Sequence, residues 1–206
     1  MSASTTPPGS PTVSDELELW LGREDAATLG GLIEHFGRNS FALVFVLLLG
    51  VPALPLPTGG ATHVFEVIAM LLAVQLIAGR REIWLPDRWQ ALKLAGPSQQ
   101  RFIRTLVRMI RRLERISRPR LRGLFGHRLS GIVFGVLVLG GSAAAFLAPP
   151  FTGLDTLPSL GVVLLSLGVL LEDILAALVA VIIGVTGVAL EIFLGSTVIH
   201  GLGSLF

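Results

Sequence analysis

The chain has 206 residues, of which 52% are hydrophobic and only 15% charged, and its mean hydropathy is +0.76. Soluble domains carry about 25% charged residues, so this composition excludes an ordinary water-soluble domain and predicts a membrane protein. The absence of cysteine excludes disulfides, thiolate metal sites and cysteine nucleophiles.

The 16 basic and 14 acidic residues are separated along the chain, although the net charge is only +2. Fourteen of the 16 basic residues lie between Arg80 and Arg128, and no Lys or Arg follows Arg128. Most acidic residues lie before residue 37 or after residue 154. The distribution predicts five regions: a disordered lead (1–13), an acidic amphipathic helical region (14–38), a first membrane hairpin (39–79), a basic cytoplasmic amphipathic region (80–128), and a second membrane hairpin with a C-terminal membrane segment (129–206).

The N-terminal part of the chain consists of the predicted disordered lead and the acidic helical region. Residues 1–13 are rich in Ser, Thr and Pro and lack the basic segment and apolar core of a signal peptide. We expect a helix to begin at Ser14, whose hydroxyl would cap it, with Asp15 in the first turn. Leu17 and Trp20 then form an apolar stripe, which predicts a surface helix docked on the protein or on headgroups. A partner-binding arm is the alternative.

The first apolar block consists of two short runs, 41–56 and 61–78, separated by a cluster of proline and glycine that must end a helix. A helix needs about 20 apolar residues to cross a bilayer, and both runs fall below that length. Two arrangements therefore remain: a tight transmembrane hairpin, which we favour, or a re-entrant hairpin buried in protein.

The basic region contains a proline-bounded segment, 97–119, in which arginines fall on one helical face and apolar residues on the other. We predict a membrane-surface helix whose arginines contact anionic lipid. Two alternatives are a helix packed on a partner subunit and an arginine site for an anionic ligand such as a polysaccharide. No nucleic-acid-binding motif accompanies it. The arginines of this face are Arg104, Arg108, Arg111, Arg115 and Arg118.

The second apolar block contains three runs, 130–148, 157–171 and 174–194, and residues 195–206 form either a sixth segment or a tail. By the positive-inside rule the basic region is cytoplasmic. Two crossings before it make the N-terminus cytoplasmic, and three after it would place the C-terminus outside.

The two apolar blocks resemble each other at an offset of 94 residues. Such repeats build many transporters, which bind their substrate at the repeat interface. The alternative is that lipid imposes the same Pro/Gly-tipped hairpin twice. If the basic region stays on one side, the repeat is parallel. The loop motif comprises Pro55, Pro57, Gly59, Pro149, Pro150 and Gly153.

Polar residues inside the apolar runs are costly and tend to be functional. His63, Glu66, Gln75 and Glu191 form a possible intramembrane site, in which His63 and Glu66 share a helical face. The alternative is that this pair lies at the interface and contacts water.

Two charged pairs bound the apolar runs. Arg80 or Arg81 could neutralise Glu172 or Asp173 across the repeat, or these charges could mark membrane borders. We find no catalytic constellation, phosphate loop or metal-ligand spacing, so we expect neither an enzyme nor a cofactor.

Several short motifs resemble those of the ExoD family of bacterial exopolysaccharide-synthesis proteins. They are PLPTG at 55–59, QLIAGR at 75–80 with WLP at 84–86, LER at 113–115 with RPRL at 118–121, and LED at 171–173. The chain departs from the family at Ile83, where proline is usual, and at Ile174, where glycine is usual. The resemblance implies a small polytopic inner-membrane protein linked to exopolysaccharide production.

Together these features predict an all-α polytopic membrane protein with about five hydrophobic segments, two Pro/Gly-tipped hairpins and an interfacial basic helix. Marginal helix lengths and glycine-bearing faces predict a homodimer. A non-enzymatic accessory or scaffold protein of exopolysaccharide synthesis or export is the first hypothesis. A small transporter or channel is the second, and an enzyme acting on lipid-linked sugars is the third.

Overall fold

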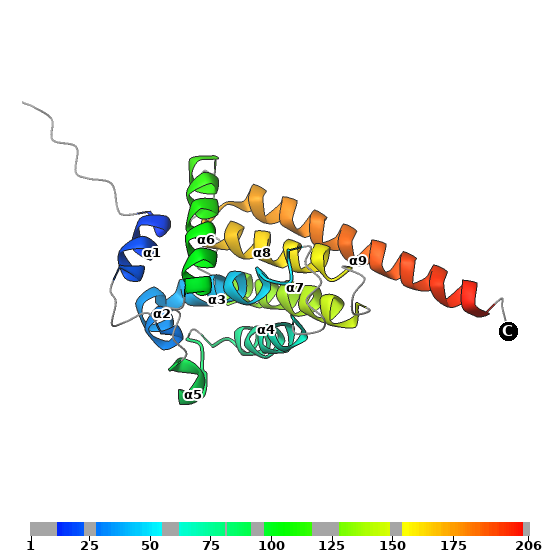
Figure 1. Cartoon of the computed structure of the whole chain (residues 1–206), viewed down its shortest axis with the longest axis horizontal. Helices are drawn as coiled ribbons and strands as arrows, with labels where there is room; N and C mark the ends of the chain where they lie inside the picture. The colour runs from blue at the N-terminus through cyan, green and yellow to red at the C-terminus, as the bar shows by residue number, and fades with distance from the viewer. Residues whose placement is uncertain are drawn as a thin grey trace, which may run out of the picture.

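The computed structural model describes residues 12–22, 28–54, 62–80, 82–91, 97–116, 128–148 and 154–203. This part of the chain is helical, which confirms the predicted all-α class. The predicted lead lies outside it except for residues 12 and 13, and so do all six residues of the loop motif. The elements are α1 (Val13–Leu21), α2 (Leu29–Phe36), the 3-10 turn η1 (Gly37–Asn39), α3 (Ser40–Leu49), α4 (Thr62–Ile77), α5 (Asp87–Gln90), α6 (Pro97–Ile116), α7 (Arg128–Leu147), α8 (Thr156–Leu170) and α9 (Ile174–Gly203) (Figure 1).

Four helices form a closed ring. α3 packs on α4 and α8, while α7 packs on the same two helices, so each member contacts two neighbours. α9 lies along α8 and also contacts α7. We call the end of this bundle where α3 and α7 stop and α4 and α8 begin the tip end.

The ring divides its helices into buried and outward-facing members. Residues 41–46 of α3 are all buried, and most of α8 is buried too. By contrast, α4, α7 and α9 each expose a row of large apolar side chains, which include Val64, Val67, Leu71 and Val74 on α4, Val133 and Val136 on α7, and Leu178, Ile182 and Val185 on α9. The large exposed apolar side chains of the bundle therefore gather on three helices, as is typical of a surface that lipid or a partner protein covers.

Two helices in the described part of the chain are long and apolar enough to cross a membrane: Arg128–Leu147 and Ile174–Leu194. Only 28% and 17% of their apolar windows are buried, so they differ from the core helices of soluble proteins. α3, α4 and α8 are apolar but shorter. Of the five predicted membrane segments, two therefore have the length and composition to cross a bilayer. Residues 195–203, which the sequence left open as a sixth segment or a tail, continue α9.

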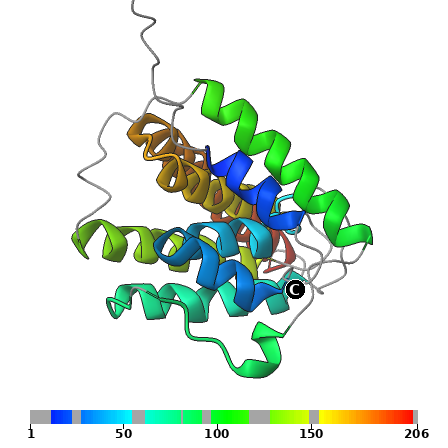
Figure 2. The same cartoon turned by 90° about the vertical axis from the view of Figure 1, so that its left-hand side faces the viewer.

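A basic helix and an acidic helix lie together at the other end of the bundle. α6 crosses that end at a steep angle to α8 and α9 (Figure 1), and α1 runs alongside α6 (Figure 2). Leu17 and Trp20 of α1 are buried, as are Leu106 and Ile110 of α6. The central part of the apolar stripe on α6 is therefore covered by the protein itself.

The predicted start of α1 is wrong. The helix begins at Val13, and the Thr12 side chain caps it by accepting a hydrogen bond from the backbone N–H of Asp15. Ser14 is fully buried instead, and its N–H and hydroxyl both donate to the carboxylate of Glu114 on α6. The Ser14 hydroxyl therefore bonds to a residue 100 positions away in the chain and does not cap the helix as the local sequence pattern had predicted.

Close glycine contacts hold α8 against α9. A Cβ atom added at Gly161 would lie 2.5 Å from the Cα of Gly184, so the backbones touch at this point. Glycine is costly within a helix, and its presence here is explained by this approach, which small residues permit between apolar helices.

We predict opposite effects from one substitution at two glycines. Gly161→Ala should lower the thermal unfolding temperature in detergent, because its new methyl meets backbone atoms; overpacking costs about 1–3 kcal/mol. Gly140→Ala on α7 meets nothing within 4 Å and should stabilise the protein slightly through helix propensity. Equal effects at the two sites would contradict the α8–α9 contact.

The docking of α1 on α6 should depend on Glu114 more than on the exposed Glu18. Glu114→Ala leaves the backbone N–H of the buried Ser14 without its acceptor, which costs about 1–3 kcal/mol, whereas exposed ion pairs contribute little. Hydrogen exchange of the α1 amides should accelerate clearly in Glu114→Ala and hardly in Glu18→Ala. The reverse order would show that charge attraction alone holds α1.

Candidate functional site

Glu66 is the most deeply buried ionisable residue in the described part of the chain, with a relative exposure of 0%. It lies on the face of α4 that packs against α7, together with Thr62, Ala69 and Ala73. The helical spacing of these small residues explains how α7 approaches closely enough to enclose the carboxylate. Within the described structure Glu66 is thus enclosed by protein.

His63 pairs with Glu66 one turn earlier on α4. Its Nδ1 lies 2.7 Å from the Oε2 of Glu66, and its side chain remains 28% exposed. The imidazole also packs edge-on against Phe146 of α7, with the ring centroids 5.2 Å apart. The pair therefore joins a buried carboxylate to a group that reaches the surface at the tip end.

The second oxygen of the Glu66 carboxylate, Oε1, is buried and has no hydrogen-bond partner in the described structure. A buried polar atom without a partner is costly and unusual. Three serine hydroxyls are fully buried and unpartnered in the same way: that of Ser40, at the start of α3, and those of Ser142 on α7 and Ser159 on α8.

The packing register places Glu66, Ser142 and Ser159 at one level of the bundle. His63 meets Phe146, and Gly135 meets Ala73 and Ile77, which sets Ser142 opposite Glu66. Gly141 likewise meets Pro158 and Val162, which sets Ser142 opposite Ser159. We call Glu66, Ser142 and Ser159 the polar layer. Sequence analysis missed both serines, because a hydroxyl in an apolar run has no distinctive spacing.

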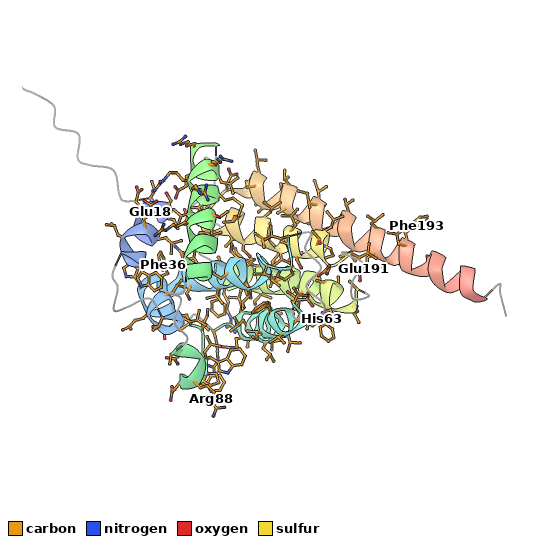
Figure 3. The ribbon with its side chains drawn as sticks, in the orientation of Figure 1. Glu18, Phe36, His63, Arg88, Glu191 and Phe193 are labelled. Carbon is orange, nitrogen blue, oxygen red and sulfur yellow. The ribbon has the colours of Figure 1, made fainter. Side chains whose placement is uncertain are left out.

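More acidic side chains lie toward the tip end. Asp155 stands just before α8, at the end of the bundle where α4 also begins. Glu191 lies on α9 and also has a buried, unpartnered oxygen, Oε2. Figure 3 shows Glu191 and His63 at the same end of the bundle. The structure thus brings three of the four proposed intramembrane residues into one region.

Gln75 lies elsewhere and has a structural role. Its side-chain amide donates to the carbonyl of Trp84 at 3.1 Å and accepts from the N–H of Trp84 at 2.9 Å. These two bonds fold the segment after α4 back against the helix.

The acidic pair that follows α8 also shapes a connection. Glu172 adopts a positive φ of 53° in the tight turn before α9. Asp173 caps α9 by accepting hydrogen bonds from the backbone of Leu175 and Ala176. This capping explains why an acidic residue stands there. Arg81, one of the proposed charge partners, lies outside the described residues, and Arg80 is exposed.

The arginine face of α6 differs in one member from its prediction. Arg104, Arg108 and Arg115 are exposed, and Arg112 is exposed beside them, while Arg118 lies outside the described residues. Arg111 turns to α1 instead, where it contacts Glu18 at 2.7 Å and Asp15 at 3.5 Å.

These contacts affect the titration of the groups that take part. The hydrogen bond to Glu18 raises the pKa of Arg111. A hydrogen bond with the Thr12 side chain lowers the pKa of Asp15, and Arg111 adds to that effect. Both groups therefore stay charged at neutral pH, and α1 masks one arginine of the basic helix.

An apolar cavity of about 460 Å³ lies between α7, α8 and α9. Gly140, Gly161 and Gly184 line it together with aliphatic side chains, and no titratable residue does. The described residues also contain no group of three or more His, Asp or Glu side chains arranged to hold a metal ion. The cavity therefore brings together no ionisable side chains, unlike the region around the polar layer.

Comparison with known proteins points to one family. The family model described as "Exopolysaccharide synthesis, ExoD" matches residues 13–193. The chain is 32% identical over 164 residues to an uncharacterized protein of the cyanobacterium Synechocystis sp., a match that covers 78% of this chain and 76% of that relative. It is 27% identical over 152 residues to Protein ExoD of Rhizobium meliloti, covering 73% of this chain but only 63% of the relative. No solved structure matches.

The pairing of His63 with Glu66 predicts a non-additive effect on stability. His63→Ala leaves the buried carboxylate without its partner and should lower the unfolding temperature markedly. The double variant His63→Ala with Glu66→Gln should be more stable than His63→Ala alone, because no buried charge remains. Thermal unfolding in detergent measures both, and additive losses would contradict the pairing.

Proposed function

The chain belongs to the ExoD family, and from this premise we propose that it is a non-enzymatic membrane protein that supports exopolysaccharide synthesis or export as an accessory or scaffold. The family description supports the process, and so does the similarity to Protein ExoD. The accessory role rests on the geometry, in which exposed charge is gathered on a helix rather than around a reaction centre.

The observation that carries this proposal is the position of α6. The helix crosses one end of a bundle whose outer helices are apolar (Figure 1). If those helices span the inner membrane of a bacterium several times, α6 lies at the membrane surface. The positive-inside rule makes that surface, and the N-terminus with it, cytoplasmic. The arginines that the described part of α6 exposes (Arg104, Arg108, Arg112 and Arg115) then face anionic lipid or an anionic partner of the synthesis machinery.

Two features support a repeated organisation of the membrane part. α4 and α8 begin at Thr62 and Thr156, which corresponds to the offset of the sequence repeat. The contacts follow the same relation, because α3 packs on α8 as α7 packs on α4. We include in the proposal that the two halves are a repeat and that the exposed apolar face of α9 pairs with a second copy in a homodimer.

A small transporter or channel is the second candidate. The observation that favours it is the burial of Glu66 beside His63 in an otherwise apolar bundle, since ionisable groups in such surroundings are usually kept for function. The two candidates differ in which residues the exopolysaccharide phenotype requires.

The arginine face provides the test of the accessory role. We expect Arg→Gln at positions 104, 108, 112 and 115 together to reduce exopolysaccharide yield several-fold in a strain that lacks the native copy, at equal protein level in the membrane. The purified variant should also lose the thermal stabilisation that phosphatidylglycerol gives over phosphatidylcholine, because each arginine near an anionic surface contributes about 1 kcal/mol.

A matched quadruple Arg→Lys variant keeps the charge and should retain both properties. If the Gln variant supports normal exopolysaccharide yield while Glu66→Gln abolishes it, the accessory role is wrong and transport is favoured. If the Gln variant still responds to phosphatidylglycerol, α6 does not lie at the lipid surface.

A further inference from the structure

The polar layer contains three buried oxygens that the protein itself leaves without partners. They are Oε1 of Glu66 and the hydroxyl oxygens of Ser142 and Ser159, all on residues with a relative exposure of 0%. They come from α4, α7 and α8, three members of the ring, and the register places them at one level. A fold does not normally retain three such atoms together unless something else binds them.

Other hydroxyls in the same helices show that these serines had an alternative. Ser166 of α8 donates to the carbonyl of Val162 at 2.8 Å, and Thr186 of α9 donates to that of Ile182 at 2.8 Å. Such bonds to the preceding turn are the usual way to satisfy a hydroxyl in a membrane helix. Ser142 and Ser159 make no bond of this kind, so their oxygens remain available in the interior of the ring.

The donor chemistry identifies the class of ligand. Carboxylate and hydroxyl oxygens are hard ligands, suited to cations that prefer oxygen. Oε2 of Glu66 is engaged by His63, which leaves Oε1 for the ligand. An ionised Glu66 gives the layer one negative charge, and a single positive charge neutralises it in the apolar interior, whereas a divalent ion would leave an excess charge.

We propose that the polar layer binds one monovalent cation of the Na⁺ or K⁺ class, with Glu66, Ser142 and Ser159 as ligands. The inference goes beyond the accessory role, because binding at this layer is compatible with either a scaffold or a transporter.

The tip end carries further acidic side chains beside the pair of His63 and Glu66. His63 is partly exposed there, Asp155 stands just before α8, and Glu191 of α9 lies at the same end (Figure 3). Acidic groups near a site raise the local concentration of cations.

The test measures thermal unfolding of the full chain in lipid nanodiscs at constant ionic strength, with choline chloride replaced stepwise by NaCl or KCl. We expect NaCl or KCl to raise the unfolding temperature with a saturable dependence, as linkage requires for a ligand that binds only the folded state. Glu66→Gln should abolish the response. Ser142→Ala and Ser159→Ala should each weaken the apparent affinity about tenfold.

The serine variants make the outcome independent of general destabilisation. Ser142→Ala removes an unsatisfied hydroxyl, so in choline chloride this variant should be at least as stable as the native chain. Ser166→Ala is the matched control in the same bundle: it loses a hydrogen bond but should keep the full cation response. Direct binding of radioactive sodium or rubidium should follow the same order across the variants.

Three results would overturn the proposal. One is equal stability in choline, sodium and potassium chloride, and another is an undiminished response in Glu66→Gln. The third is stabilisation by acid pH alone with no dependence on the cation, which would identify Glu66 as a proton site instead.

Discussion

The whole arrangement depends on the burial of α3 and α8 by their neighbours. These two helices have 10 and 15 residues, too few to cross a bilayer, but most of their residues are buried against the neighbouring helices. The end of α3 also stays hydrogen-bonded, because the N–H groups of Gly50 and Ala53 continue to bond to carbonyls of its last turns. The protein thus surrounds its shortest apolar segments with its own helices, and α4, α7 and α9 carry the exposed apolar surface.

Much of this organisation follows from where charge and proline stop the apolar runs. The runs 61–78 and 157–171 correspond to α4 and α8 within one residue at each end, because the limits are set by local residue types. Contacts between distant segments could not be predicted in this way. Ser14 was expected to cap α1, but Glu114 takes its hydroxyl, and Arg111 faces Glu18 rather than solvent. In each case the partner lies in another part of the chain.

In the candidate site, too, the sequence pattern identifies some residues, whereas others are revealed only by contacts between distant segments. Glu66 and His63 stand out in the sequence because an acid and a histidine one turn apart are rare in an apolar run. Ser142 and Ser159 do not stand out, since serine is tolerated in membrane helices and usually bonds to its own backbone. Only the register of α4, α7 and α8 reveals that their hydroxyls share a level with a carboxylate. Gln75 illustrates the opposite error, because a polar residue in an apolar run here closes a local turn at Trp84.

The last part of α9 has a consequence for how the protein tolerates its surroundings. The helix continues beyond the start of α8, its partner, and Figure 1 shows it projecting past the rest of the bundle. Ile192 and Phe193 are each 67% exposed there. Because this segment projects past the other described helices, the strength of its backbone hydrogen bonds depends on the surrounding medium. In an apolar medium they face no competition, whereas water would fray the helix from Gly203 inward. We therefore expect the helical length of α9 to depend on the solvent around it. The four helices of the ring pack on one another and should not show this dependence.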